Sequence, residues 1–335
     1  MSVFVIAEAG ANHNNNFEQA KTLIDIAHTS GADAVKFQTY SSETLYSKHT
    51  PDFAGLKNIS KLIKDIELPR EWQKDLKQYC DSIGIEFMST PFDELAVRQL
   101  VELGVKRLKI AGFESTDPRF VKMVAATKLP IIVSAGIGSN ILSIQNIIDW
   151  ITSVNNEPDI TILHCNNAYP TPDQDINLNR IDAILQMYPK IKVGLSDHTE
   201  GVLAPSLAVA KGATCIEKHF TISRMLPGPD HPFALEPDKL KEMIDNIRLS
   251  EKMCVDTNFL FTKSEDKFFK GMRSVVCRAD IKKGETFTER NLTTKRPFLS
   301  GNFHASQYYN LIGKKAEKDY TYDDFVKMKE VKDEI

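Results

Sequence analysis

The chain has 335 residues, of which 42% are hydrophobic and 9% aromatic, and its formal net charge is −3. This composition is sufficient for a large hydrophobic core and excludes an intrinsically disordered chain, and the nearly balanced charge excludes a strongly basic surface for nucleic acid or an acidic membrane. We therefore expect a soluble globular protein with one large domain and one small one.

The apolar run at the start, residues 3–11, is interrupted by Glu8, is too short to cross a bilayer and has no basic leader. We expect a cytoplasmic protein that binds neither a membrane nor nucleic acid. The cysteines are odd in number and scattered, which favours reduced thiols over a disulfide framework. The five are Cys80, Cys165, Cys215, Cys254 and Cys277.

From residue 3 to about 221, short β-rich runs alternate with stretches whose apolar residues recur at helical spacing. This alternation predicts a closed (β/α)₈ barrel rather than an open doubly wound sheet. The eight expected strands are 3–10, 34–39, 86–91, 107–112, 130–136, 160–165, 192–198 and 215–221. The expected helices are 17–30, 71–82, 93–103, 117–127, 141–154, 177–188, 201–211 and 237–252.

Three segments fall outside this repeat. The polar gap 40–70 predicts a loop over the catalytic face that serves as a lid. Residues 253–271 have no clear period and indicate a linker between a barrel domain, 1–252, and a small β-rich domain, 272–335. A domain of about 60 residues buries little surface unaided, so we expect it to pack on a barrel, its own or a partner's.

Alternation across the strands directs polar side chains into the barrel, because residues two apart in a strand share a face. In CIEKHFT (215–221), Glu217 and His219 share the face opposite the apolar Ile216 and Phe220, which belong against the helices. The same argument turns a further set inward: Lys36, Gln38, Lys109, Ser134, Ser196 and His198. Polar groups at the C-terminal ends of so many strands predict an active site there.

Two histidines, His198 and His219, come at matching depth on consecutive strands. Divalent metal ions favour neutral imidazole ligands, and Glu8 on the first strand, which closes beside the eighth, offers a hard oxygen. This pattern favours a metal site over a pair of hydrogen-bonded core histidines.

Two lysines, Lys36 and Lys109, are also directed inward. Two ammonium groups among hydroxyls and an amide form a cage that suits a dianion such as a phosphate group. The alternative is that both lysines pair with Glu217 or Glu8 for structural reasons. The neutral partners available to the cage are Thr90, Ser134, Asn167 and Ser196.

Nine motifs, taken in order, resemble the sialic acid synthase family of phosphoenolpyruvate-dependent nonulosonic acid synthases. They are AEAGANHN (7–14), KFQT (36–39), STPF (89–92), KIAGFE (109–114), SAG (134–136), HCNNAYPTP (164–172), GLSDHT (194–199), EKHFT (217–221) and GPDHPFALEP (228–237). In the tail, RSVV, IKKGE and KRP are similar to the family's antifreeze-like (SAF) domain. The resemblance therefore covers essentially the whole chain.

The resemblance implies a role for each matching residue. Phosphoenolpyruvate is then held by Lys36, Thr90, Lys109, Ser134, Asn167 and Ser196. The acylated amino sugar is held by Gln38, Glu114, Tyr169, Asp230 and Arg296. A manganese or magnesium ion is bound by His198 and His219, with Glu8 beside it. The resemblance also implies a domain-swapped homodimer, in which Arg296 reaches the sugar of the neighbouring subunit.

Two departures from the family pattern accompany the resemblance. Gly112 stands where many members have a serine, which implies that one substrate contact is missing or filled by water. After Pro297 the family commonly continues with glycine, whereas here Phe298, Leu299 and Ser300 follow and change the surroundings of Arg296.

The expected reaction joins phosphoenolpyruvate, an open-chain N-acetylmannosamine-type sugar and water into a nine-carbon 2-keto acid of sialic or legionaminic acid type, with release of phosphate. The expected catalytic groups are Glu8, His198, Glu217 and His219, with either carboxylate moving protons. Pseudaminic acid synthase, or a related synthase of seven- or eight-carbon sugar acids, is the nearest alternative. Two others are a Schiff-base aldolase using Lys36, Lys109 or Lys218 and a non-catalytic ice- or carbohydrate-binding protein.

Overall fold

A computed structural model describes residues 2–52, 58–254 and 261–331. The chain divides into two compact units, Met1–Val255 and Asp256–Ile335, and each is described by itself. No helix in the described ranges is both long enough and apolar enough to cross a membrane.

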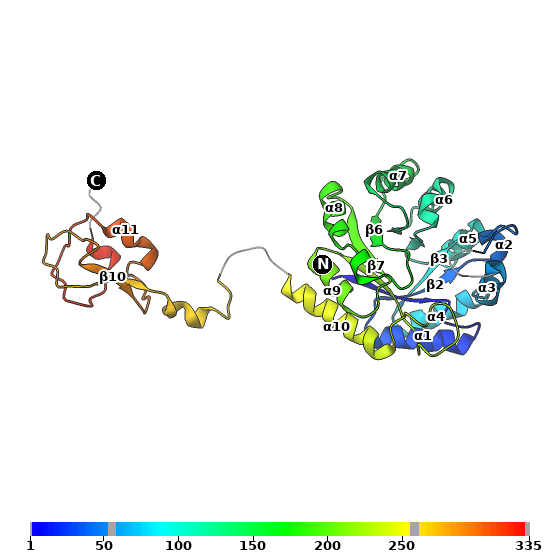
Figure 1. Cartoon of the computed structure of the whole chain (residues 1–335), viewed down its shortest axis with the longest axis horizontal. Helices are drawn as coiled ribbons and strands as arrows, with labels where there is room; N and C mark the ends of the chain where they lie inside the picture. The colour runs from blue at the N-terminus through cyan, green and yellow to red at the C-terminus, as the bar shows by residue number, and fades with distance from the viewer. Residues whose placement is uncertain (1, 53–57, 255–260, 332–335) are drawn as a thin grey trace. The chain divides into compact units, whose positions relative to one another are not determined.

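The first unit is built on eight parallel strands. They are β1 (Phe4–Gly10), β2 (Ala34–Thr39), β3 (Glu86–Pro91), β4 (Leu108–Ile110), β5 (Ile131–Ala135), β6 (Ile160–Cys165), β7 (Lys192–Asp197) and β8 (Cys215–His219). Their order in the sheet is β3-β2-β1-β8-β7-β6-β5-β4, and the two end strands, β3 and β4, contact each other. The sheet is therefore a nearly closed barrel, as the alternating pattern predicts, and Figure 1 shows the helices arranged around it.

The helices of this unit follow the strands in the order expected for a (β/α)₈ barrel. They are α1 (Phe17–Ser30), α4 (Trp72–Ile83), α5 (Glu94–Glu102), α6 (Pro118–Ala126), α7 (Ile141–Thr152), α8 (Asn179–Met187), α9 (Leu203–Ala210) and α10 (Pro237–Met253). Two short 3₁₀ helices, η1 (Glu114–Thr116) and η2 (Asp173–Asp175), precede α6 and α8. Local capping explains both boundaries of α1: the Asn16 side chain accepts from the Gln19 amide at its start, and Gly31, with φ 90°, caps its C-terminal end.

The segment 40–70 differs from the loop that its composition indicates. It contains two short helices, α2 (Ser42–Leu45) and α3 (Ile59–Asp65), while residues 53–57 lie outside the described part of the chain. Helices of four and seven residues are too short to give a clear apolar period. Strand β4 is also shorter than the expected 107–112, because the Ser115 amide donates to the Ala111 carbonyl and the chain turns into η1.

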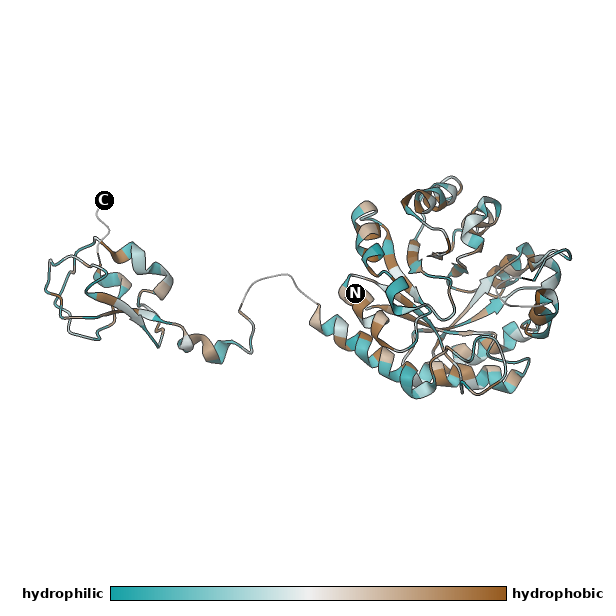
Figure 2. Cartoon of the chain, in the orientation of Figure 1, coloured by the Kyte–Doolittle hydropathy of each residue, from teal (hydrophilic) through white to brown (hydrophobic). Residues whose placement is uncertain are grey.

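The hydrophobic core has two layers. The larger one fills the space between strands and helices, and the helices carry both hydrophobic and hydrophilic residues along their length (Figure 2). The smaller one plugs the lower half of the barrel lumen and consists of Ile6, Ala34, Met88, Ile132, Leu163 and Cys215, with Phe4 packed against it. The lumen therefore changes from apolar to polar along most of the strands, because the next inward positions there are polar.

The second unit has a small core of its own. Strand β9 (Ser274–Cys277) pairs antiparallel with β10 (Leu292–Lys295), and single β-bridges such as Val276 with Phe325 extend the pairing. The other elements are η3 (Asp266–Gly271), η4 (Ala305–Gln307), α11 (Tyr308–Leu311) and η5 (Met328–Glu330). Nine buried residues, among them Val275, Phe287 and Tyr320, form one hydrophobic cluster. The unit is β-rich, and its packing on a barrel stays a prediction.

Candidate active site

A polar pocket opens at the C-terminal ends of the barrel strands, directly above the apolar plug. Most of its lining comes from positions that strand alternation turns inward. The lining residues are Glu8, Lys36, Gln38, Thr90, Lys109, Ala111, Gly112, Ser134, Cys165, Asn167, Tyr169, Ser196, His198, Glu217 and His219. The structure thus brings together all six residues expected to hold phosphoenolpyruvate and all four expected catalytic groups.

One side of the pocket is organised around Lys36. Its Nζ lies 2.7 Å from Glu8 Oε2 and donates to Thr90 Oγ1 at 2.8 Å, while the Gln38 amide donates to Glu8 Oε1 at 2.8 Å. Burial raises the pKa of Glu8 to about 7, against the lowering effect of the Lys36 charge. Burial alone would lower the pKa of Lys36, but Glu217 and Glu8 together raise it, so this ammonium group stays charged.

The facing side is organised around Lys109. Its Nζ donates to Ser134 Oγ at 2.7 Å and lies 3.6 Å from Glu217 Oε1, which also accepts from Ser196 Oγ at 3.2 Å. Burial lowers the pKa of Lys109, against the raising effect of Glu217. For Glu217, burial raises the pKa, but Lys109 and Lys36 outweigh it and the pKa falls below its usual value. An ionised Glu217 therefore lies between two ammonium groups.

The two histidines close the third side of the pocket. The ring centroids of His198 and His219 are 5.5 Å apart, and Tyr169 packs on His198 with a centroid distance of 4.2 Å. His198 Nδ1 is 2.6 Å from the Asn166 carbonyl, which can only accept, so this nitrogen carries the proton and Nε2 keeps a free lone pair. Among the described residues His219 Nδ1 is buried without a hydrogen-bond partner.

These imidazoles have the chemistry that a divalent cation needs. Burial lowers the pKa of His198, and burial together with His198 holds the pKa of His219 well below its usual range, so both rings are neutral. The described residues contain no cluster of three or more His, Cys, Asp or Glu side chains able to hold a metal ion. Two protein ligands would leave the other coordination positions to water and substrate. The two neutral imidazoles, one of them with an unpartnered Nδ1, offer ligands for such an ion, and metal binding between them stays a prediction.

Asn167 is held between two glycines at the edge of the pocket. Its Oδ1 accepts from the Ile137 amide at 2.7 Å. A Cβ atom at Gly136 would lie 2.0 Å from this oxygen, and one at Gly112 would lie 2.9 Å from it. The space above Gly112 is thus occupied by the Asn167 side chain, which accounts for a residue without a Cβ where the family pattern has a serine.

The residues expected to bind the sugar are dispersed. Gln38 and Tyr169 line the pocket, and Asp230 Oδ2 lies near it, 3.8 Å from His219 Nδ1. Glu114 is half-buried in η1, outside the lining, and burial raises its pKa. Arg296 is exposed and belongs to the second unit, so its contact with a sugar stays a prediction.

Sequence reasoning missed three residues around the pocket. Cys165 lines it two residues before Asn167, and alternation from Leu163 would have identified it. Asp197 forms a buried ion pair with Lys218 on the outer face of the barrel wall, 2.6 Å from Asp197 Oδ2 to Lys218 Nζ. Phe233 packs against His219 with a centroid distance of 5.2 Å. It lies in the loop after β8, where no strand period predicts its direction.

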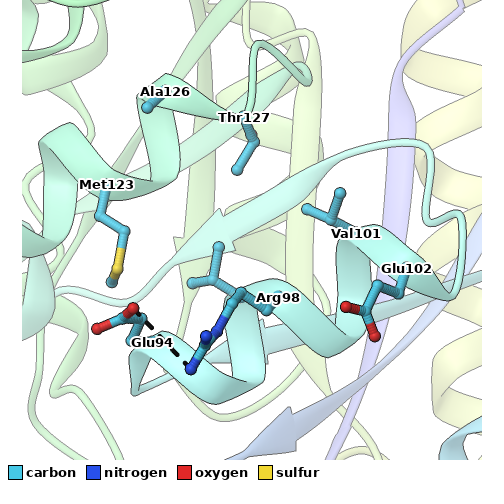
Figure 3. A pocket seen from close by; sticks show the side chains of 8 residues that line it. Glu94, Arg98, Val101, Glu102, Met123, Ala126 and Thr127 are labelled. Atoms are coloured by element: carbon cyan, nitrogen blue, oxygen red, sulfur yellow. Dashed lines mark ion pairs between the residues drawn. The ribbon is translucent and has the colours of Figure 1, made fainter.

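A second cavity lies in the helix layer between α5 and α6 (Figure 3). Its charged residues are exposed, and Arg98 lies 3.9 Å from Glu94, its partner one turn away on α5. The cavity contains none of the convergent buried polar groups of the lumen. It is separate from the candidate active site.

Comparison with known proteins identifies the chain's relatives. The NeuB family matches residues 23–258, and the SAF domain matches residues 272–331. An N,N'-diacetyllegionaminic acid synthase from Campylobacter jejuni is 38% identical over 96% of this chain and 98% of its own length. A pseudaminic acid synthase from the same species is 36% identical over 97% and 95%. A solved sialic acid synthetase from Leptospira borgpetersenii is 31% identical, with a TM-score of 0.75 over 81% of this chain and 91% of that one.

Proposed function

The chain belongs to the NeuB family, and from this premise we propose that it condenses phosphoenolpyruvate, an open-chain N-acetylmannosamine-type sugar and water into a nine-carbon 2-keto sugar acid and phosphate. The product is of sialic or legionaminic acid type. One observation carries the proposal: the buried ammonium groups of Lys36 and Lys109 face the same pocket as the two neutral imidazoles of His198 and His219.

Phosphoenolpyruvate fits the lysine side of the pocket. Its phosphate and carboxylate bring several negative charges, and charge-assisted hydrogen bonds from ammonium groups are the strong ones in a water-poor site. Lys36 and Lys109 already donate to Thr90 and Ser134, so their side chains are held in place before the substrate arrives. This preorganisation favours binding because little side-chain freedom is left to lose.

His198 and His219 would hold a divalent cation, Mn²⁺ or Mg²⁺. When bound, such an ion supplies Lewis acidity towards the aldehyde oxygen of the sugar. The protein's part is to keep both imidazoles neutral by burial and to fix the His198 ring through its bond to the Asn166 carbonyl. Tyr169, packed on His198, excludes water from one side of the ring.

The pocket then serves a sequence of two bond-forming steps. Lys36 and Lys109 orient phosphoenolpyruvate so that its enol carbon attacks the aldehyde carbon, and water adds to the resulting oxocarbenium carbon before phosphate leaves. The proton that the water loses balances the one that the new hydroxyl group gains. Glu8 or Glu217 carries this proton. A pKa of about 7 suits Glu8 both to accept the proton from water and to donate it to the new hydroxyl group.

The sugar would extend from the two histidines towards Gln38, Tyr169 and Asp230. In a domain-swapped homodimer, Arg296 of the second subunit would complete this part of the site. Similarity to a pseudaminic acid synthase at 36% identity, close to the 38% of a legionaminic acid synthase, makes a pseudaminic acid precursor the second candidate substrate.

The Schiff-base alternative needs an unprotonated amine in the pocket. The raised pKa of Lys36 disfavours that role, and Lys218 is turned away from the lumen and paired with Asp197. Lys109 remains as a candidate because burial lowers its pKa. Borohydride trapping with a 2-keto acid distinguishes this chemistry, because a condensation on phosphoenolpyruvate leaves no covalent adduct.

The proposal is tested by incubating the purified protein with phosphoenolpyruvate, Mn²⁺ and one of three acceptors: N-acetylmannosamine or the diacetamido-trideoxy sugars that lead to legionaminic and pseudaminic acid. We expect phosphate release that requires both substrates and a product whose mass equals their sum plus water minus phosphoric acid. Omitting the sugar is the control. Absence of turnover with every acylated sugar would remove the proposed function.

A further inference from the structure

A buried ion pair lies behind the barrel wall, directly next to the candidate active site. Lys218 and Asp197 are 2% and 0% exposed. Asp197 lies between Ser196 and His198 in the chain, and Lys218 lies between Glu217 and His219. Each member of the pair thus separates two pocket residues while pointing to the opposite face.

The pair is part of a larger set of bonds at the end of β7. Lys218 Nζ donates to Asp197 Oδ2 at 2.6 Å and to the Thr199 carbonyl. Asp197 Oδ1 accepts from the Thr199 amide at 2.9 Å, and Asp197 Oδ2 accepts from Thr199 Oγ1 at 3.1 Å. The ammonium group of Lys218 on β8 therefore binds both residues that flank His198 in the sequence, Asp197 and Thr199.

These bonds begin where the backbone ladder ends. The last register pair between β7 and β8 is Asp197 with Lys218, so no further ladder pair joins His198 to His219. The His198 carbonyl accepts from the Thr171 amide at 2.8 Å, which ties it to the loop after β6 instead. The distance between the two imidazoles consequently depends on how the turn carrying His198 is attached to β8.

We propose that Lys218 is a positioning residue which, together with Asp197 and Thr199, sets the spacing of His198 and His219 and thereby the affinity of the site for a divalent cation. The inference rests on the proposed function only in taking these two histidines as metal ligands. Residues that orient metal ligands from behind typically change metal affinity about 10- to 100-fold when they are altered.

A purely structural role is the competing explanation, because many buried ion pairs contribute to packing alone. Removing Lys218 by itself would leave the Asp197 carboxylate buried and unpaired, which is strongly destabilising. The double variant Asp197→Asn, Lys218→Met avoids this, because neither new side chain is charged and the introduced amide oxygen can still accept from the Thr199 amide. It removes the attachment between the two strands without an isolated charge.

The chain offers a second inter-strand ion pair, less deeply buried, as a control at the other end of the barrel. Arg107 Nε lies 2.7 Å from Glu86 Oε1, linking the segment before β4 to the start of β3. The double variant Glu86→Gln, Arg107→Met also removes an inter-strand ion pair, but far along the strands from the histidines. A general effect of losing an inter-strand ion pair would appear in both double variants, and a positioning effect only in the first, with circular dichroism showing whether the first variant keeps its fold.

The experiment titrates the wild type and both double variants with Mn²⁺ alone, following free Mn²⁺ by electron paramagnetic resonance, with near-UV circular dichroism to check folding. For Asp197→Asn, Lys218→Met we expect a dissociation constant raised about 10- to 100-fold and a kcat that recovers at high Mn²⁺. We expect the wild-type constant for Glu86→Gln, Arg107→Met.

The outcomes separate the two claims. A wild type that binds no Mn²⁺ contradicts the metal assignment of the proposed function. If the wild type and the folded Asp197→Asn, Lys218→Met variant bind Mn²⁺ with the same affinity, the positioning role of Lys218 is overturned, while the metal assignment of the proposed function stands. If that variant does not fold, Asp197→Asn takes its place, since it keeps the shape of the side chain while weakening the pair, and an unchanged affinity overturns the inference equally.

Discussion

The Oε1 atom of Glu217 lies 3.6 Å from Lys109 Nζ, and both side chains are buried at the top of the barrel lumen. Lys36 lies on the other side of the same carboxylate, 3.7 Å from its Oε2 atom. A carboxylate in this position favours the charged form of both lysines and lets them lie close together, although burial still lowers the pKa of Lys109. An anion that offers both lysines better hydrogen-bond geometry than Glu217 does can therefore bind between them.

Replacing Lys109 should therefore weaken anion binding specifically. We expect Lys109→Met to raise the dissociation constant of phosphoenolpyruvate about 10- to 100-fold, because a hydrogen bond to a charged group contributes roughly 1.5–3 kcal/mol. Isothermal titration calorimetry measures the constant. The exposed neighbour Lys106→Met is the control and should bind like the wild type. Equal affinity for Lys109→Met and the wild type would exclude the lysine cage.

Gly112 should be sensitive to a single methyl group. In Gly112→Ala the new Cβ atom would lie 2.9 Å from Asn167 Oδ1 and 3.0 Å from its Nδ2, so the amide must move and its bond to the Ile137 amide is strained. We expect KM for phosphoenolpyruvate to rise about 2- to 10-fold, the value of one neutral hydrogen bond. Gly271→Ala, which meets no atom within 4 Å, is the control. An unchanged KM would show that Asn167 does not contact this substrate.

Glu8 should control part of the pH dependence. Burial raises its pKa to about 7, so the carboxylate becomes ionised as the pH rises through neutrality. If Glu8 accepts a proton, kcat/KM rises with pH over the same range, and this ascending limb disappears in Glu8→Gln. The exposed Glu94→Gln variant should keep the limb. A Glu8→Gln enzyme with the wild-type pH profile would assign the proton transfer to Glu217.

His13 provides a test of the fold rather than of the site. Burial lowers its pKa from 6.5 to about 4, so between these values the unfolded chain binds more protons than the folded one. Stability contributed by neutral His13 is complete above pH 6.5 and is lost as the pH falls towards 4. Relative to His13→Gln, we expect the wild type to lose about 1.4 kcal/mol of unfolding free energy per pH unit below pH 6. A difference in unfolding free energy between the wild type and His13→Gln that is the same at pH 5 and at pH 7 would contradict this.

Much of the barrel was predictable because strand and helix periods are properties of the sequence. Side chains two residues apart share a face of a strand, and this alternation directs Lys36, Lys109 and Glu217 into the lumen. The parallel strands of the barrel then bring their C-terminal ends, and with them these side chains, together. The bonds of the site were not predictable in the same way. Whether Lys36 contacts Glu8 or Glu217 depends on side-chain reach across the barrel.

Contacts made by loops follow no period at all. The position of Asn167 against Gly112 joins the ends of β4 and β6 through loop geometry, and the departure from the family pattern at Gly112 is explained only once both loops are in place. Helices α2 and α3 were missed for a related reason, since a few residues cannot display a period. The attachment of Lys218 to Thr199 depends on a turn beyond the end of the ladder.

The most direct test of the account is a crystal structure of the protein with phosphoenolpyruvate and Mn²⁺, with data collected at the manganese absorption edge. We predict an anomalous peak between the imidazoles of His198 and His219, and the anionic groups of phosphoenolpyruvate in hydrogen-bond contact with Lys36 and Lys109. Manganese elsewhere, or phosphoenolpyruvate bound away from both lysines, would contradict the account.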